Sequence, residues 1–244
     1  MMPKASIQTF TVALLLCLSA LAALAKDTDK RDLDGFHAIA VGGGIDLVIH
    51  QGSRYAVTVH AESGDTDDVE TQIEHDTLII RKTSGFFSSG VFHGFGVFRW
   101  FEHFSVDVTL PKLENVSASG GSNVGFDSNF SAEKLQLRTS GGSDLRFTGK
   151  ADSLDVITSG GSDTFLDGSA RQLTVRISGG SDLHARGFEV SDAELVASGG
   201  SDIDITVKEK LSARASGGSD IRYAGNPPHT DVKASGGADI RARR

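Results

Sequence analysis

Cysteine is nearly absent from this sequence, and its absence limits how the fold can be held together. The single cysteine, Cys17, lies in an apolar run near the N-terminus, so the chain after residue 25 contains no thiol. Disulfide bonds, thiolate metal sites and cysteine nucleophiles are therefore excluded from that part of the chain. Its stability must come from side-chain packing and backbone hydrogen bonds.

Proline and helical patterning are also scarce. The 244 residues include 4 prolines but 29 glycines, and apolar residues at helical spacing are missing after residue 26. Abundant glycine together with period-two alternation predicts an all-β protein. The formal net charge is −8, and an acidic surface of this kind argues against nucleic acid as a partner.

The N-terminal segment has the features of a secretory signal peptide. Lys4 precedes an apolar run from Thr9 to Leu24, and the run ends in the small-residue pattern of Ala23 and Ala25. Residues 1–25 are therefore predicted to be a cleaved signal, and an uncleaved membrane anchor is the alternative. We expect the mature chain, residues 26–244, to be exported to the periplasm, the outer surface or the medium.

A pentapeptide, Ser-Gly-Gly-Ser-Asp or a near variant, recurs seven times in the second half of the chain. Successive copies are separated by 21, 19, 19, 20, 18 and 19 residues, and they begin at Ser119, Ser140, Ser159, Ser178, Ser198, Ser216 and Ser235. A fixed period with glycine punctuation is typical of stacked structural units that complete one another's core. The repeat predicts seven stacked coils.

Side chains alternate strictly within each coil. In the coil of Ser140, one side holds Leu135, Leu137, Thr139, Gly141, Ser143, Leu145 and Phe147. We expect this side to face the interior, including the first glycine and second serine of each pentapeptide, with the aspartate facing out. Equivalent strands then pair in parallel at about 4.8 Å. The prediction is an all-β, parallel β-helix or β-solenoid-like fold with coils of about 19 residues.

Residues 33–84 lack the pentapeptide but keep the β alternation. The motif Val-Gly-Gly-Gly-Ile-Asp-Leu-Val-Ile-His-Gln-Gly begins at Val41, Asp-Val-Glu-Thr begins at Asp68, and Val-Thr-Leu-Pro begins at Val108. With the Ser-Gly-Gly coils, these motifs resemble the head GIN domain family, which is named for autotransporter adhesins. The resemblance covers nearly all of residues 33–241. It implies a secreted, envelope-associated β-solenoid with no established catalytic residues.

The chain is expected to divide into three parts. Residues 1–25 are the signal peptide, residues 26–110 are an N-terminal β region with an aromatic insertion at 85–104, and residues 111–244 are the repeat solenoid. The insertion lies where the resembled family leads us to expect a shorter connection between strands.

The first candidate site is a column of outward aspartates, one from each coil. Its members are Asp144, Asp163, Asp182, Asp202, Asp220 and Asp239. Stacked carboxylates repel one another, and calcium ions between coils would relieve that repulsion. Alternatively, each aspartate caps its own turn, with Arg146, Arg222 and Arg241 offsetting the charge. Both interpretations remain open at this point, and calcium is the single cofactor they suggest.

The second candidate site is the aromatic insertion, which holds half of the 14 phenylalanines and the only tryptophan. Its binding candidates are Phe92, Phe95, Phe98, Trp100 and Phe101. So many apolar rings need burial or a partner, so the segment is expected to contact a membrane surface, sugar rings or a protein. The alternative is that it covers the open first coil of the solenoid.

Catalysis is the interpretation with the least support. The eight histidines are dispersed along the chain without a closely spaced metal-binding pair, and no nucleophile arrangement is recognisable. We therefore expect a non-catalytic, exported binding or adhesin-like module that contacts a glycan or an envelope or surface protein. The alternatives are an inert scaffold or stalk and, with less support, a carbohydrate-active enzyme.

Overall fold

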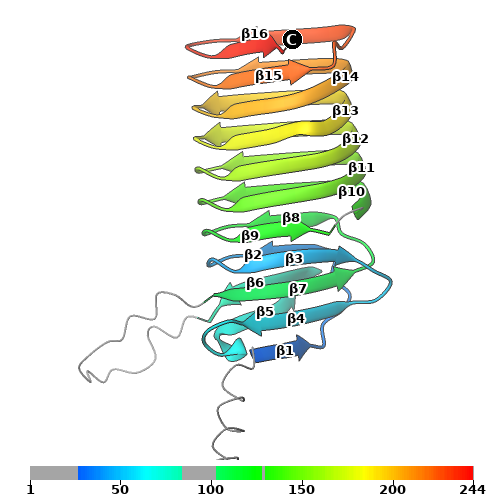
Figure 1. Cartoon of the computed structure of the whole chain (residues 1–244), viewed down its shortest axis with the longest axis vertical. Helices are drawn as coiled ribbons and strands as arrows, with labels where there is room; N and C mark the ends of the chain where they lie inside the picture. Colours follow the sequence, from blue (N-terminus) through cyan, green and yellow to red (C-terminus); the bar gives the residue numbers. More distant parts are fainter. Residues whose placement is uncertain (1–26, 84–102, 128–129, 244) are drawn as a thin grey trace, which may run out of the picture.

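The computed structural model describes residues 27–83, 103–127 and 130–243, which form one tall stack of β coils (Figure 1). The first strands are β1 (Asp27–Arg31), β2 (Ala38–Val41), β3 (Asp46–Gln51), β4 (Ala56–Ala61), β5 (Val69–Glu74), β6 (Thr77–Lys82), β7 (Phe104–Leu110), β8 (Asn115–Ala118) and β9 (Asn123–Phe126). The others are β10 (Phe130–Ser140), β11 (Asp144–Ser159), β12 (Asp163–Gly179), β13 (Asp182–Gly199), β14 (Asp202–Ala215), β15 (Asp220–Ala224), β16 (His229–Ala234) and β17 (Asp239–Ala242). A single 3₁₀ turn, η2 (Thr66–Asp68), is the only helical element among these residues, and none of their helices could span a membrane.

Each coil in the second half of the chain leaves a glycine turn, runs along one face, bends, and returns along the other face to the next turn. Neighbouring coils pair in parallel and in register, so that Asp144 lies beside Asp163 and Leu154 beside Leu173. The same register continues from β12 to β13 and from β13 to β14, with small irregularities at the bends. The predicted β-solenoid with coils of about 19 residues is therefore confirmed.

The interior is a continuous apolar column, as the alternation predicts. β11 has inward side chains that are at most 1% exposed, namely those of Leu145, Phe147, Leu154 and Val156. The outward residues between them are more exposed to solvent. Since every coil contributes the same inward positions, each coil completes the core of its neighbours. Burial of these side chains is the main favourable contribution to folding.

The glycine turns differ from the prediction at one position. Ser143, Ser162 and Ser181 are 0% exposed and face the interior as expected, but Gly141 is exposed. The expectation that the first glycine faces inward is therefore wrong. Gly141 and Gly142 both have positive φ, 68° and 76°, so they reverse the chain and interrupt the strand alternation. The buried serine hydroxyls connect the coils, because the Ser143 N–H donates to Ser162 Oγ at 3.2 Å.

The N-terminal part adds coils to the same stack. β2 pairs in parallel with both β6 and β8, and β3 pairs in parallel with both β7 and β9. Gly42 to Asp46 form a turn equivalent to the pentapeptide, with Ile45 in the place of the inward serine. Ile45 is 0% exposed and its N–H donates to Ser122 Oγ at 3.2 Å. The β2–β3 coil therefore lies between the β6–β7 coil and the β8–β9 coil.

Antiparallel strands close the N-terminal end of the stack. β4 pairs with β7, β5 pairs with β6, and β1 pairs with β4 as the outermost strand. β1 carries charged, exposed residues, which discourage pairing with another chain at this edge. In the β5–β6 hairpin, a hydrogen bond from Arg81 lowers the pKa of Glu70, so this exposed pair remains charged.

Candidate functional site

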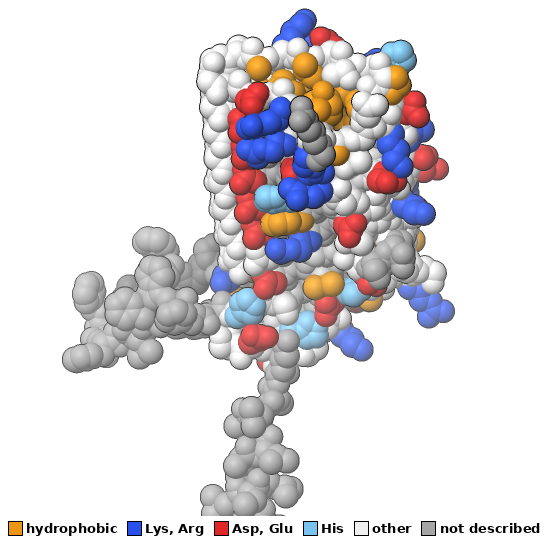
Figure 2. Space-filling view, turned by 45° about the horizontal axis from the view of Figure 1, so that its top comes forward, with side chains coloured by type: hydrophobic (Ala, Val, Ile, Leu, Met, Phe, Trp, Pro, Cys, Tyr) orange, Lys and Arg blue, Asp and Glu red, His pale blue; other side chains and the backbone are white. Residues whose placement is uncertain are grey.

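The outward aspartates form the predicted column. Asp144, Asp163 and Asp182 are register partners on neighbouring coils, and the register continues through Asp202 and Asp220. Asp239 completes the series as the partner of Asp220. Figure 2 shows acidic side chains as a line running along the stack beside a line of basic, hydrophobic and histidine side chains.

Hydrogen bonds in the described residues do not match the predicted aspartate caps. The turn N–H groups of Ser122, Ser143 and Ser162 donate to serine hydroxyls of the next coil. Asp182 Oδ1 does accept a backbone N–H at 3.2 Å, but that N–H belongs to Asp202 of the next coil. The turns of these coils are therefore closed by the buried serines, and the aspartates form their contacts with side chains and with the neighbouring coil.

Arginines neutralise the upper part of the column, as predicted. Arg222 lies 2.9 Å from Asp220 and 3.4 Å from Asp202, and Arg241 lies 3.1 Å from Asp239. Arg241 also lies 3.5 Å from Asp220, so each arginine connects carboxylates of neighbouring coils. These are partly exposed ion pairs, so each contributes at most about 1 kcal/mol to stability.

A second outward column follows two residues after the aspartates. Its register partners are Arg146, Phe165, His184, Asp204, Arg222 and Arg241. The Phe165 and His184 rings are stacked at 4.8 Å with an angle of 20° between their planes. Arg146 lies over the Phe165 ring at 4.4 Å and not beside an aspartate. Because the rings stack along the solenoid axis, they present their edges to solvent.

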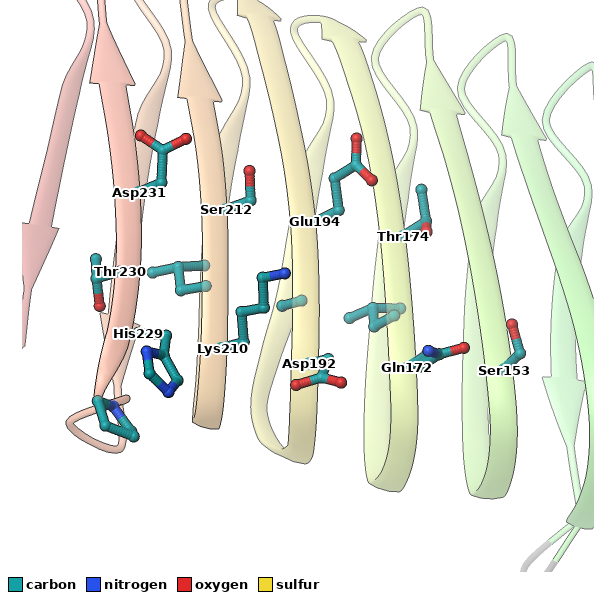
Figure 3. A pocket seen from close by; sticks show the side chains of 14 residues that line it. Ser153, Gln172, Thr174, Asp192, Glu194, Lys210, Ser212, His229, Thr230 and Asp231 are labelled. Carbon is teal, nitrogen blue, oxygen red and sulfur yellow. The ribbon is translucent and has the colours of Figure 1, made fainter.

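The opposite face carries an open groove of about 910 Å³ that crosses the returning halves of several coils. Its two rows of polar side chains are drawn in Figure 3. One row contains Ser153, Gln172, Asp192, Lys210 and His229, and the other contains Thr174, Glu194, Ser212 and Asp231. Gln172, Glu194 and Lys210 are exposed. This groove was not predicted from the sequence, although its outward polar residues recur at the repeat period.

The fold gathers histidines that are dispersed in the sequence. On β3, β4 and β7, His60 Nε2 lies 2.8 Å and His50 Nε2 lies 3.8 Å from carboxylate oxygens of Asp107. His103 Nε2 lies 3.0 Å from Asp46. These histidines and aspartates all point outward from their strands. They become neighbours only because β3 and β4 both pair with β7.

The aromatic binding candidates Phe92, Phe95, Phe98, Trp100 and Phe101 lie outside the described residues. The flanking strands do define where the segment joins the fold. It connects β6 to β7, whose register partners β2 and β3 are connected by the glycine turn that contains Ile45. The end of β6 and the start of β7 are therefore the counterparts of the strand ends that the Ile45 turn connects. Phe104, its last residue, belongs to β7 and is 0% exposed, so that ring is part of the core.

The family comparison agrees with this geometry. The family model described as "Putative auto-transporter adhesin, head GIN domain" matches residues 35–227, which is most of the chain. The chain belongs to the head GIN domain family. The match begins just before β2 and ends after β15, so it includes the glycine turn of the β2–β3 coil and most pentapeptide coils. A search of the curated proteins found no match.

Solved structures of similar fold include proteins from Bacteroides and Parabacteroides. A "putative adhesin" from Bacteroides fragilis has a TM-score of 0.74 and 18% identity, covering 88% of this chain and 96% of that chain. A "putative adhesin" from Parabacteroides merdae has a TM-score of 0.67 and 20% identity, covering 89% and 96%. A "putative lipid binding protein" from Parabacteroides distasonis has a TM-score of 0.67 and 14% identity, covering 88% and 96%. At these identities, the likeness shows the fold of this head GIN protein and not its ligand.

Proposed function

We propose that this head GIN protein is an exported, non-catalytic binding module of the adhesin type, and that its partner is a glycan of the cell envelope or the surroundings. The predicted signal peptide supports export, and the adhesin name of the family supports a binding role. Enzymatic action has little support because the candidate surfaces are open faces of short coils and not enclosed clefts.

The observation that carries this proposal is the groove with its two ordered rows of polar side chains (Figure 3). Gln172 and Lys210 offer hydrogen-bond donors, while Glu194 and the Gln172 carbonyl offer acceptors. Sugar hydroxyl groups both donate and accept, so a mixed surface of this kind suits an oligosaccharide better than a polyanion. The side chains stand on paired strands, which hold them in position before a ligand arrives.

We expect the triple variant Gln172→Ala, Glu194→Ala and Lys210→Ala to bind glycans at least about tenfold more weakly than the parent protein, a loss of about 1.4 kcal/mol. The measurement is binding of the mature protein to an oligosaccharide array, followed by titration of each glycan retained. The matched control replaces an amide, an acid and a lysine of the N-terminal cap, Gln72, Glu74 and Lys30, with alanine.

Three further results would change the proposal. Equal retention of both variants would remove the groove from the binding role. Loss of retention only in a Phe95→Ser, Trp100→Ser and Phe101→Ser variant would transfer the contact to the aromatic insertion. Failure of the parent protein to bind any glycan, envelope protein or cell surface would favour an inert scaffold.

A further inference from the structure

The aspartate column is neutralised along only part of its length. Asp202, Asp220 and Asp239 have arginine partners two residues along their strands or on the next coil. Two residues after Asp163 and Asp182, the chain has Phe165 and His184 instead. Among the described residues, no Lys or Arg side chain forms an ion pair with Asp163 or Asp182. Two neighbouring half-buried carboxylates therefore repel each other without a compensating cation.

An imidazole takes the place of the missing arginine. One carboxylate oxygen of Asp163, one of Asp182 and a ring nitrogen of His184 all lie within 4.8 Å of one another. Ligands bonded to a common ion at about 2.1 Å are at most about 4.2 Å apart. Small side-chain rotations would therefore bring the three atoms into one coordination shell. The ligands come from β12 and β13, so a bound ion would connect two coils.

The surrounding residues hold these ligands in place. The imidazole of His184 is stacked on Phe165, and Arg146 covers that ring from the preceding coil. The second oxygen of the Asp182 carboxylate group can face an ion while Oδ1 accepts the Asp202 N–H at 3.2 Å. Contacts of this kind orient metal ligands and raise affinity. None of the other column positions combines two neighbouring aspartates with a histidine.

We propose that Asp163, Asp182 and His184 form a binding site for a divalent transition-metal ion, with Zn²⁺ as the reference ion. Calcium and magnesium prefer shells made of oxygen ligands, whereas one imidazole with two carboxylates suits zinc, nickel, cobalt or copper. Water completes the shell, since three protein ligands leave positions open. The site lies on the face opposite the groove and is independent of the proposed glycan binding.

The test is calorimetric titration of the mature protein with ZnCl2 and with CaCl2, together with thermal unfolding at each metal concentration. We expect Zn²⁺ to bind and to raise the Tm, because an ion that binds only the folded state stabilises it. His184→Gln and Asp163→Asn should each lower the Zn²⁺ affinity at least about tenfold. The matched control is His75→Gln, which removes another exposed imidazole outside both proposed sites and should leave the affinity unchanged.

Binding at pH 5.5 should be weaker than at pH 7.5, since a protonated imidazole cannot bind a metal ion. NMR signals of the His184 ring nitrogens should shift on addition of Zn²⁺. Zinc binding that is unaltered by His184→Gln would place the ion elsewhere, for example at His50 and His60, and would overturn the proposal. Calcium binding that depends on the aspartates but not on His184 would replace the zinc site with a calcium column. The absence of binding and of any Tm change with either ion would also overturn the proposal.

Discussion

Replacing Phe147 with alanine should lower the free energy of unfolding by about 4 kcal/mol. Phe147 is 1% exposed and lies at the centre of an aromatic cluster inside the solenoid. The centroid of its ring is 5.1 Å from that of Phe126, 6.5 Å from that of Phe130 and 6.2 Å from that of Phe188, all in edge-to-face arrangements. These rings come from β9, β10, β11 and β13, so the cavity would weaken the packing of several coils at once.

The measurement is equilibrium unfolding of the mature protein in guanidinium chloride. Phe147→Leu is the matched control, because it keeps an apolar side chain of similar length and should cost less than about 1.5 kcal/mol. Equal losses for alanine and leucine would show that shape, and not cavity volume, determines the effect. A loss below 1 kcal/mol for alanine would contradict the assignment of Phe147 to the core.

Replacing Gly168 with alanine should destabilise the protein by about 3 kcal/mol or more. Gly168 lies at the bend between the two faces of its coil and has a φ of 120°. A Cβ atom at this position would lie 1.9 Å from the carbonyl oxygen of Gly149 in the preceding coil. Since that oxygen belongs to the backbone, relief requires the two coils to separate at the bend, where their hydrogen bonds would lengthen.

Gly161→Ala is the matched control for this substitution. Gly161 also has positive φ, 80°, but a Cβ atom there would meet nothing within 4 Å. Its replacement should therefore cost only the backbone strain of about 1 kcal/mol. Similar losses for Gly161→Ala and Gly168→Ala would show that φ, and not the close approach of coils, is the origin of the effect. Thermal and denaturant unfolding measure both variants.

The repeat half of the fold was predictable because one short pattern decides it. The alternation from Leu135 to Phe147 identifies the inward side chains, and the 19-residue period identifies the partners that stack on them. The β2–β3 coil was harder to recognise. Its turn has Ile45 in place of serine, so the pentapeptide pattern does not reveal it, although the buried position and the coil partner are the same.

The candidate sites were less predictable than the fold. The sequence indicated an aspartate column, and the register places Asp163 beside Asp182 as expected. The histidine within reach of both could not be selected in advance, because His184 is one of eight dispersed histidines. Which histidine lies near two aspartates depends on the direction of each side chain and on the register between neighbouring coils. The position of a residue in the sequence gives neither of these.

The sequence by itself determined the class, the period and the interior of this protein. The alternation of side chains and the spacing of glycines recur in every coil. The sequence of one coil therefore predicts which residues of the next coil stack on it. The tertiary structure alone decided the order of the N-terminal coils and the form of the turns. β2 lies between β6 and β8 because long-range pairing, not chain order, satisfies its two edges.

The conformation of the glycine turns is also decided by the tertiary structure and not by the local sequence. Gly161 has positive φ, whereas Gly200, at the same place in an identical pentapeptide, does not. The Gly200 N–H donates to the carbonyl oxygen of Gly179 in the coil below at 2.7 Å, while the Gly161 N–H donates to Ser181 Oγ at 3.1 Å. Identical local sequences therefore adopt two turn conformations, because the hydrogen-bond acceptor that each neighbouring coil offers selects between them.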